Sequence, residues 1–231
     1  MSAVLLVWTP GIGHEGYAPL HDALVAAGHE VSIVALPCSG DAEHLAEVVG
    51  KRISAQPEPP VVVAHGVGAT LALLAADRGE VAGWVLLAPV LDAPDEAATD
   101  FLARQTLGAS VDLSRPLLWR DRDVRHVLLG EDLPPLGCFP AGLARDLARW
   151  VGPEAPPIPV AAVTSPVWVG VGLLDELAPP EVVVPLAREL GADIERIGIS
   201  GLDGRDFDHA GMLTATPPIS AAVRAVREVT R

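Results

Sequence analysis

A series of short, mostly apolar runs separated by helix-like stretches constrains the fold more than any other feature. A strand that is apolar along its whole length is buried on both faces, which is typical of a parallel sheet covered by helices on each side. The sequence therefore predicts an α/β fold on a mostly parallel six-stranded sheet with helices on both faces. The six runs are Ala3–Trp8, Val31–Leu36, Val61–Ala64, Val81–Ala88, Pro166–Val171 and Ile194–Ile199.

Helical segments alternate with these runs. Glycines end two of the segments, at Gly28 and Gly79, and Asp41 stands where an N-cap is expected. Because nearly every helix leads from one strand to the next, residues 1–231 are expected to form a single domain. The predicted helices are Tyr17–Ala27, Asp41–Ala55, Ala69–Arg78, Pro180–Leu190 and Pro218–Arg231.

The alternation breaks down between residues 91 and 159. This stretch contains several tryptophans and phenylalanines, and it leaves through the proline-rich sequence GPEAPPIP. We expect a mostly helical insertion after the fourth strand.

The charge balance excludes several classes of partner. The chain has 16 basic and 30 acidic side chains and a formal net charge of −14. Such a chain is repelled by phosphate backbones and by anionic membrane surfaces, so we expect no nucleic-acid or membrane partner. No stretch approaches the roughly 20 apolar residues of a membrane span. The amino-terminal apolar run is also too short for a signal peptide, so we expect a cytoplasmic location.

The cysteines and histidines support two further predictions, one about disulfides and one about metal binding. Two cysteines, Cys38 and Cys138, are too few for a disulfide framework, and we expect reduced thiols. The seven histidines are scattered without ligand spacing, so no metal site is expected.

A glycine-rich turn follows the first strand. Gly11–Gly16 matches the dinucleotide pattern GxGxxG, but no acidic residue for a ribose follows the second strand until Asp41. The stretch from Val4 to Leu36 also resembles the opening of two-domain sugar-nucleotide glycosyltransferases, for which the chain is too short. We therefore interpret the glycines as a structural turn and expect no cofactor.

Three later strand ends carry a more specific pattern. Ala64-His65-Gly66-Val67-Gly68-Ala69 follows the third strand, where G-x-S-x-G forms the nucleophile elbow of α/β-hydrolases. Asp175 follows the fifth strand and His209 the sixth, so the order is elbow, acid, histidine. The chain therefore resembles the α/β-hydrolase superfamily from Val4 to Arg231. The resemblance implies that residues 91–159 form the helical cap.

Residue 66 departs from the family pattern because glycine stands in place of the nucleophile. Removing the nucleophile of a serine hydrolase costs about 10⁶ in kcat, so acyl-enzyme hydrolysis through this residue is excluded. A displaced nucleophile would have to be Cys38, Ser39 or Thr9. Atypical members of this fold occur in natural-product pathways, and the peptide epimerase of bottromycin biosynthesis is one whose type this chain resembles. That resemblance implies that substrate groups can themselves supply the base.

The predicted catalytic pair is His209 with Asp175, in which the carboxylate fixes the tautomer of the imidazole. Asp92 is an alternative acid. The expected elbow and oxyanion backbone groups belong to Gly66, Val67 and Thr9. Gly11 is the alternative to Thr9, because Pro10 between them has no N–H to donate.

Side chains expected to contact substrate lie on the loops at the strand ends and in the insertion. These residues are Trp8, His14, His65, Trp119 and Phe139.

Three functions remain open from the sequence. The first is a non-hydrolytic epimerase, isomerase or cyclase acting on a carbonyl-containing natural-product intermediate, such as a modified peptide or a polyketide. The second is a catalytically silent pseudo-hydrolase that binds a small ligand. The third is a hydrolase that uses His-activated water or a displaced nucleophile.

Overall fold

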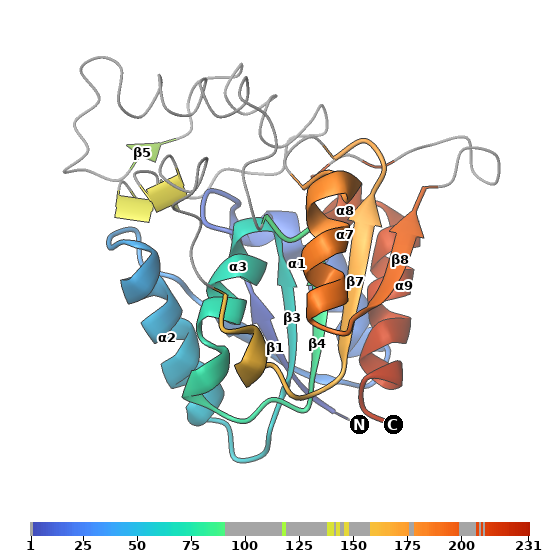
Figure 1. Ribbon diagram of the computed structural model, residues 1–231, viewed down its shortest axis with the longest axis horizontal. Coiled ribbons are helices and arrows are strands. Elements are labelled where there is room, and N and C mark those ends of the chain that lie inside the picture. Colours follow the sequence, from blue (N-terminus) through green and yellow to red (C-terminus); the bar gives the residue numbers. More distant parts are fainter. Residues whose placement is uncertain are drawn as a thin grey trace.

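The computed structural model describes residues 2–90, 117–118, 138–140, 142–143, 146–147, 158–175, 178–198, 207, 209 and 211–231. Its centre is a six-stranded sheet of order β2-β1-β3-β4-β7-β8, in which every neighbouring pair is parallel (Figure 1). The predicted sheet is confirmed. Its strands are β1 (Ala3–Val7), β2 (Glu30–Val34), β3 (Val61–His65), β4 (Gly83–Leu87), β7 (Val167–Gly172) and β8 (Asp193–Ile197).

Helices cover both faces of this sheet. Figure 1 shows α2, α3 and α7 on the near face, with α1 and α9 behind it. The short helix α8 packs against α1 and α9. The bounds are α1 (His14–Ala26), α2 (Ala42–Ser54), α3 (Gly66–Leu74), α7 (Pro180–Glu189), α8 (Gly211–Thr214) and α9 (Thr216–Glu228).

Burial differs between the central and the edge strands. Every residue of β3, β4 and β7 is buried, whereas β2 and β8 each have exposed or half-buried positions. The central strands therefore show continuous apolar runs, and the edge strands admit charges such as Asp193 and Arg196. The core lies between the central strands and the two helical layers.

Helix α1 begins at His14, three residues earlier than predicted. Gly16 and Pro19 lie inside it, and both residue types disfavour helix in isolation. Packing overrides this preference because Tyr17 and Leu20 on this helix are fully buried. Helix α2 begins as predicted, since the Asp41 carboxylate accepts a hydrogen bond from the backbone N–H of His44 at 2.9 Å.

Most of the predicted insertion lies outside the described residues. Its described part includes a short antiparallel pair that we did not predict, β5 (Leu117–Leu118) with β6 (Cys138–Phe139). Nearby, the N–H of Ala42 at the start of α2 donates to the Asp146 carboxylate at 2.8 Å. This contact joins the insertion to the amino end of a core helix, where a carboxylate is favourable.

Cys38, which follows β2, is disulfide-bonded. The prediction of reduced thiols is therefore wrong for this residue. The chain contains one other cysteine, Cys138. A small number of cysteines argues against a disulfide framework, but a single bridge requires only that two thiols lie close together.

In the part of the chain that the structure describes, no helix is long and apolar enough to span a membrane.

Candidate active site

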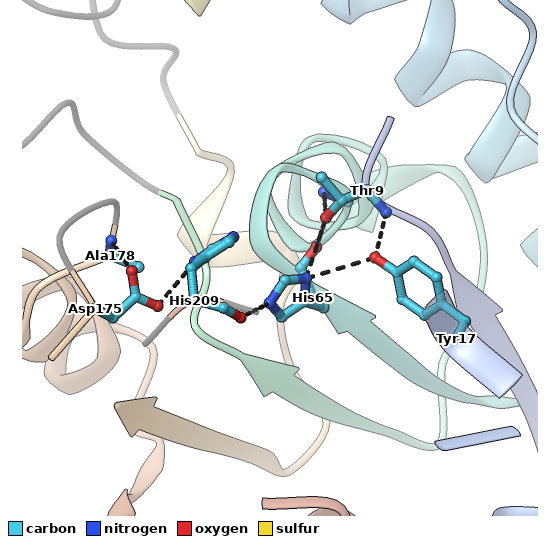
Figure 2. A network of polar contacts seen from close by, with 7 residues as sticks. Thr9, Tyr17, His65, Asp175, Ala178 and His209 are labelled. Carbon is cyan, nitrogen blue, oxygen red and sulfur yellow. Dashed lines mark hydrogen bonds and ion pairs between the residues drawn. The ribbon is translucent and has the colours of Figure 1, made fainter. Parts of the chain in front are cut away.

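Four of the predicted residues meet at the carboxyl edge of the sheet. Thr9 follows β1, His65 ends β3, Asp175 follows β7, and His209 lies before α8 (Figure 2). The chain moves from β1 outward to β2 and then back to β3 on the other side of β1. Open parallel sheets bind ligands at such a switch point, outside the carboxyl ends of their strands.

A sharp strand-to-helix turn joins β3 to α3. His65 is extended, and the next residue, Gly66, has φ 55° and already begins the helix. Glycine adopts this left-handed conformation without the penalty of a Cβ. A Cβ on Gly68 would lie 2.6 Å from the backbone oxygen of Trp8, so only glycine lets α3 approach the end of β1 this closely. The backbone thus has the form expected of a nucleophile elbow, with no side chain at its tip.

His209 and Asp175 form a buried pair. His209 Nδ1 lies 2.8 Å from Asp175 Oδ2, and Asp175 Oδ1 accepts a hydrogen bond from the N–H of Ala178 at 2.8 Å. The two residues are only 4% and 2% exposed. Because a carboxylate accepts hydrogen bonds, it assigns the proton of the neutral imidazole to Nδ1 and leaves a lone pair on Nε2.

That free nitrogen points at the tip of the elbow. A Cβ built on Gly66 would lie 2.6 Å from His209 Nε2 and 2.8 Å from Thr9 Oγ1. Contacts this short do not occur around real side chains, so the imidazole would have to move if residue 66 carried one. The position of the imidazole and the glycine at residue 66 therefore depend on each other.

His65 lies beneath this pair and is fully buried. Its Nε2 is 2.9 Å from the backbone oxygen of His209, which only accepts, so Nε2 carries the proton. Burial, and secondarily the charge on His209, hold the pKa of His65 well below its usual value. His65 is therefore neutral at physiological pH.

Tyr17 and Thr9 surround the other nitrogen of His65. Tyr17 Oη and Thr9 Oγ1 lie 3.5 and 3.4 Å from His65 Nδ1. The Thr9 hydroxyl donates instead to the backbone oxygen of His65, so the phenol of Tyr17 is the donor available to Nδ1. Burial raises the pKa of Tyr17, which keeps this proton on the phenol. Figure 2 shows the resulting row of contacts from Asp175 to Tyr17.

The sequence did not reveal the role of Tyr17. It is the only tyrosine of the chain, and we placed it at the start of a helix without assigning it a function. A signal was present in hindsight, because a buried phenol requires a polar partner.

The predicted oxyanion donors differ in what they contact. The N–H of Thr9 donates to Tyr17 Oη at 2.7 Å, so it already has an acceptor in this structure. The N–H of Val67 belongs to the first turn of α3, where no acceptor exists within the helix. It is part of the positive end of the helix dipole and remains the predicted donor.

The side chains predicted to contact substrate differ in burial, and the structure describes only some of them. Trp8 is half-buried, and its ring stacks on Tyr17 with centroids 5.7 Å apart. His65 is fully buried, so it offers no surface to a substrate in this structure. His14 begins α1 and Phe139 lies in β6, but their side chains are not described. Trp119 and the alternative acid Asp92 lie outside the described residues.

Among the described residues, no group of three or more histidine, cysteine or acidic side chains is placed to hold a metal ion. The disulfide at Cys38 also removes that residue from the candidate displaced nucleophiles, because a disulfide has no thiolate to attack with.

Comparison with known proteins decides the family. The model of the alpha/beta hydrolase family matches residues 4–218. The chain belongs to the alpha/beta hydrolase family. No curated protein matches it.

Solved structures of other alpha/beta hydrolases share its fold. A monoacylglycerol lipase from Paleococcus ferrophilus is 20% identical, with 99% of this chain and 93% of that chain covered at a TM-score of 0.61. A thermophilic esterase from Thermogutta terrifontis is 18% identical, with 100% and 91% covered at 0.65. A pyrethroid hydrolase from Sphingobium faniae is 17% identical, with 99% and 97% covered at 0.65. At these identities the likeness concerns the fold alone.

Proposed function

We propose that this alpha/beta hydrolase family member is a proton-transfer enzyme. It acts as an epimerase, isomerase or cyclase on a carbonyl-containing intermediate, such as a modified peptide or a polyketide. One observation carries the proposal: His209 Nε2 would lie 2.6 Å from a Cβ on Gly66. An imidazole whose Nε2 lies this close to the position of the nucleophile is suited to act on a substrate directly.

The reaction follows from the protonation states of the pair. Nε2 of His209 takes a proton from the carbon next to a substrate carbonyl, and the C–H electron pair moves into an enolate. The Asp175 carboxylate stabilises the imidazolium that forms, as it does in a hydrolytic triad. The enolate oxygen faces the N–H of Val67 at the start of α3. Protonation of the other face of the carbon by water, with His209 then losing its proton to solvent, gives epimerisation. Return of the proton from His209 to another atom of the enolate gives isomerisation.

Acyl transfer to an enzyme side chain is less well supported by the same geometry. Residue 66 has no oxygen to attack with, and Cys38 is disulfide-bonded. Thr9 Oγ1 is close to the site, but its proton is donated to the backbone oxygen of His65 rather than to His209. A base must accept the proton of a hydroxyl to activate it.

A second candidate is hydrolysis by water that His209 activates. The same glycine favours it, because His209 Nε2 and Thr9 Oγ1 both lie close to the position that a side chain on residue 66 would take. Two polar atoms that converge in this way are suited to hydrogen-bond a water molecule. In this case the imidazole takes the proton of water and the hydroxide attacks an ester carbonyl.

Deuterium exchange separates these candidates. Wild-type protein and His209→Gln are incubated in deuterated water with N-acyl amino-acid thioesters, β-keto esters and p-nitrophenyl esters, beside a fluorophosphonate probe. Deuterium incorporation at the α carbon that disappears in His209→Gln supports proton transfer. Ester cleavage without exchange or probe labelling supports activated water. Ligand binding without either reaction supports the silent pseudo-hydrolase and contradicts our proposal.

A further inference from the structure

We propose that His65 is a positioning residue that aims the imidazole of His209 at Gly66 by holding the backbone oxygen of His209. The catalytic consequence of this role rests on the proposed function. The geometric role does not, and it is tested without any substrate.

Two described residues before α8, Phe207 and His209, have their backbone oxygens held by hydrogen bonds. The Phe207 oxygen accepts from the N–H of Leu174 at 3.3 Å, and the His209 oxygen accepts from His65 Nε2 at 2.9 Å. Of these two hydrogen bonds, the one from His65 holds the backbone of His209 itself. Because Asp175 holds the ring at Nδ1, the backbone and the side chain of His209 are held separately.

The direction of each hydrogen bond is determined. The N–H of Thr9 can only donate, so Tyr17 Oη accepts from it and directs its own proton to His65 Nδ1. With Nδ1 as an acceptor, the neutral ring of His65 carries its proton on Nε2, which donates to His209. Tyr17 thus selects the tautomer of His65 that can donate to the backbone oxygen of His209.

The two imidazole rings are also in contact. The centroids of His65 and His209 are 4.3 Å apart, and their planes are tilted by 45°. A charged His65 would repel the imidazolium that His209 forms during proton transfer. Burial keeps the pKa of His65 low, so it serves as a neutral support beside a base that changes charge.

Two substitutions at residue 65 test this role. His65→Gln keeps an N–H donor near the position of Nε2, whereas His65→Leu keeps the bulk and removes the donor. Ile53→Val on α2 is a buried control. It lowers stability without altering the contacts of His65 and His209. The readout is ¹⁵N-edited NMR of the histidine side chains, which reports the tautomer of His209 and the exchange of its Nδ1–H.

We expect a single Nδ1–H tautomer of His209 in wild type, His65→Gln and Ile53→Val. In His65→Leu the Nδ1–H should exchange about tenfold faster, because one buried hydrogen bond changes an equilibrium by roughly that factor. A folded His65→Leu with wild-type exchange would overturn the proposal. Tyr17→Phe gives an independent test, since it should yield mixed tautomers of His65 and faster exchange at His209. Unchanged spectra in Tyr17→Phe would likewise contradict the role.

Activity adds a separate readout once a turnover assay exists. His65→Leu should lower kcat with little change in KM, and His65→Gln should restore most of it. Absence of turnover in every variant would count against the proposed function but would leave the NMR result to decide the role of His65.

Discussion

The two halves of the candidate site retain different parts of a hydrolase. On the β3–α3 side the backbone of the elbow is intact, with a left-handed Gly66 and a Gly68 that permits close helix packing, but no reactive side chain is present. On the β7–β8 side the buried His209–Asp175 pair is complete. The difference teaches that backbone geometry and reactive chemistry are separable, since packing maintains the first and individual side chains carry the second.

Replacing His209 should have the largest effect, because the proposed reaction depends on its imidazole as the base. His209→Gln is expected to slow α-proton exchange about 10³-fold, within the usual contribution of a general base. The exposed His44→Gln on α2 is the matched control and should leave the rate unchanged. A loss smaller than tenfold would indicate that the substrate supplies its own base.

Adding a side chain to the elbow should disturb both halves of the site, because a Cβ on Gly66 would displace the imidazole of His209. Gly66→Ala is expected to lower the free energy of unfolding by about 3 kcal/mol, from left-handed strain and displacement of the imidazole. Gly191→Ala is the matched control, because its φ of 65° is similar but nothing lies within 4 Å of a Cβ there. It should lose only about 1 kcal/mol. Urea unfolding of both variants measures the difference, and equal losses would mean that His209 does not occupy the space beside residue 66.

The pH dependence of stability should report the buried His65. Its pKa is lowered in the folded chain, so below pH 6.5 the unfolded chain takes up a proton that the folded chain does not. The free energy of unfolding therefore falls as pH falls through this window, by up to about 1.4 kcal/mol per pH unit.

His65→Gln should remove this slope. Between pH 6.5 and 5 it should lose less stability than wild type, measured by urea unfolding at each pH. Parallel pH profiles of the two proteins would show that His65 titrates normally.

The smallest effect is expected from a change at Ala88. This residue follows β4 with φ 44°, a left-handed conformation that is rare for alanine. Ala88→Gly should raise the free energy of unfolding by about 0.5 kcal/mol, since relief of strain outweighs the added chain entropy. Ala72→Gly within α3 should instead lower the free energy of unfolding by about 1 kcal/mol, because glycine disfavours a helix. Thermal unfolding can measure both changes. A destabilised Ala88→Gly would mean that the left-handed conformation costs little there.

Most of the fold could be predicted because buried parallel strands show as apolar runs. The pairing of His209 with Asp175 was also predictable, since residues that follow strands of one parallel sheet converge at one edge. The start of α1 was missed because tertiary packing of Tyr17 overrides the local effect of Gly16 and Pro19.

Other features depend on three-dimensional contacts that a linear pattern does not contain. Nothing in the spacing indicates that Tyr17 accepts from the N–H of Thr9, or that Asp146 reaches the start of α2. The disulfide of Cys38 was likewise missed, because proximity of two thiols leaves no signature in sequence.

The hydrogen bond from His65 to His209 joins residues 144 positions apart. Such a contact requires the amino-terminal strands and the residues before the last helices to have come together, so loop closure over a long stretch of chain must come before it. The alignment of His209 with the elbow therefore requires both ends of the fold to be in place. A chain whose carboxyl-terminal half has not docked has an elbow but lacks the imidazole that faces it, so the proposed reaction requires the completed fold.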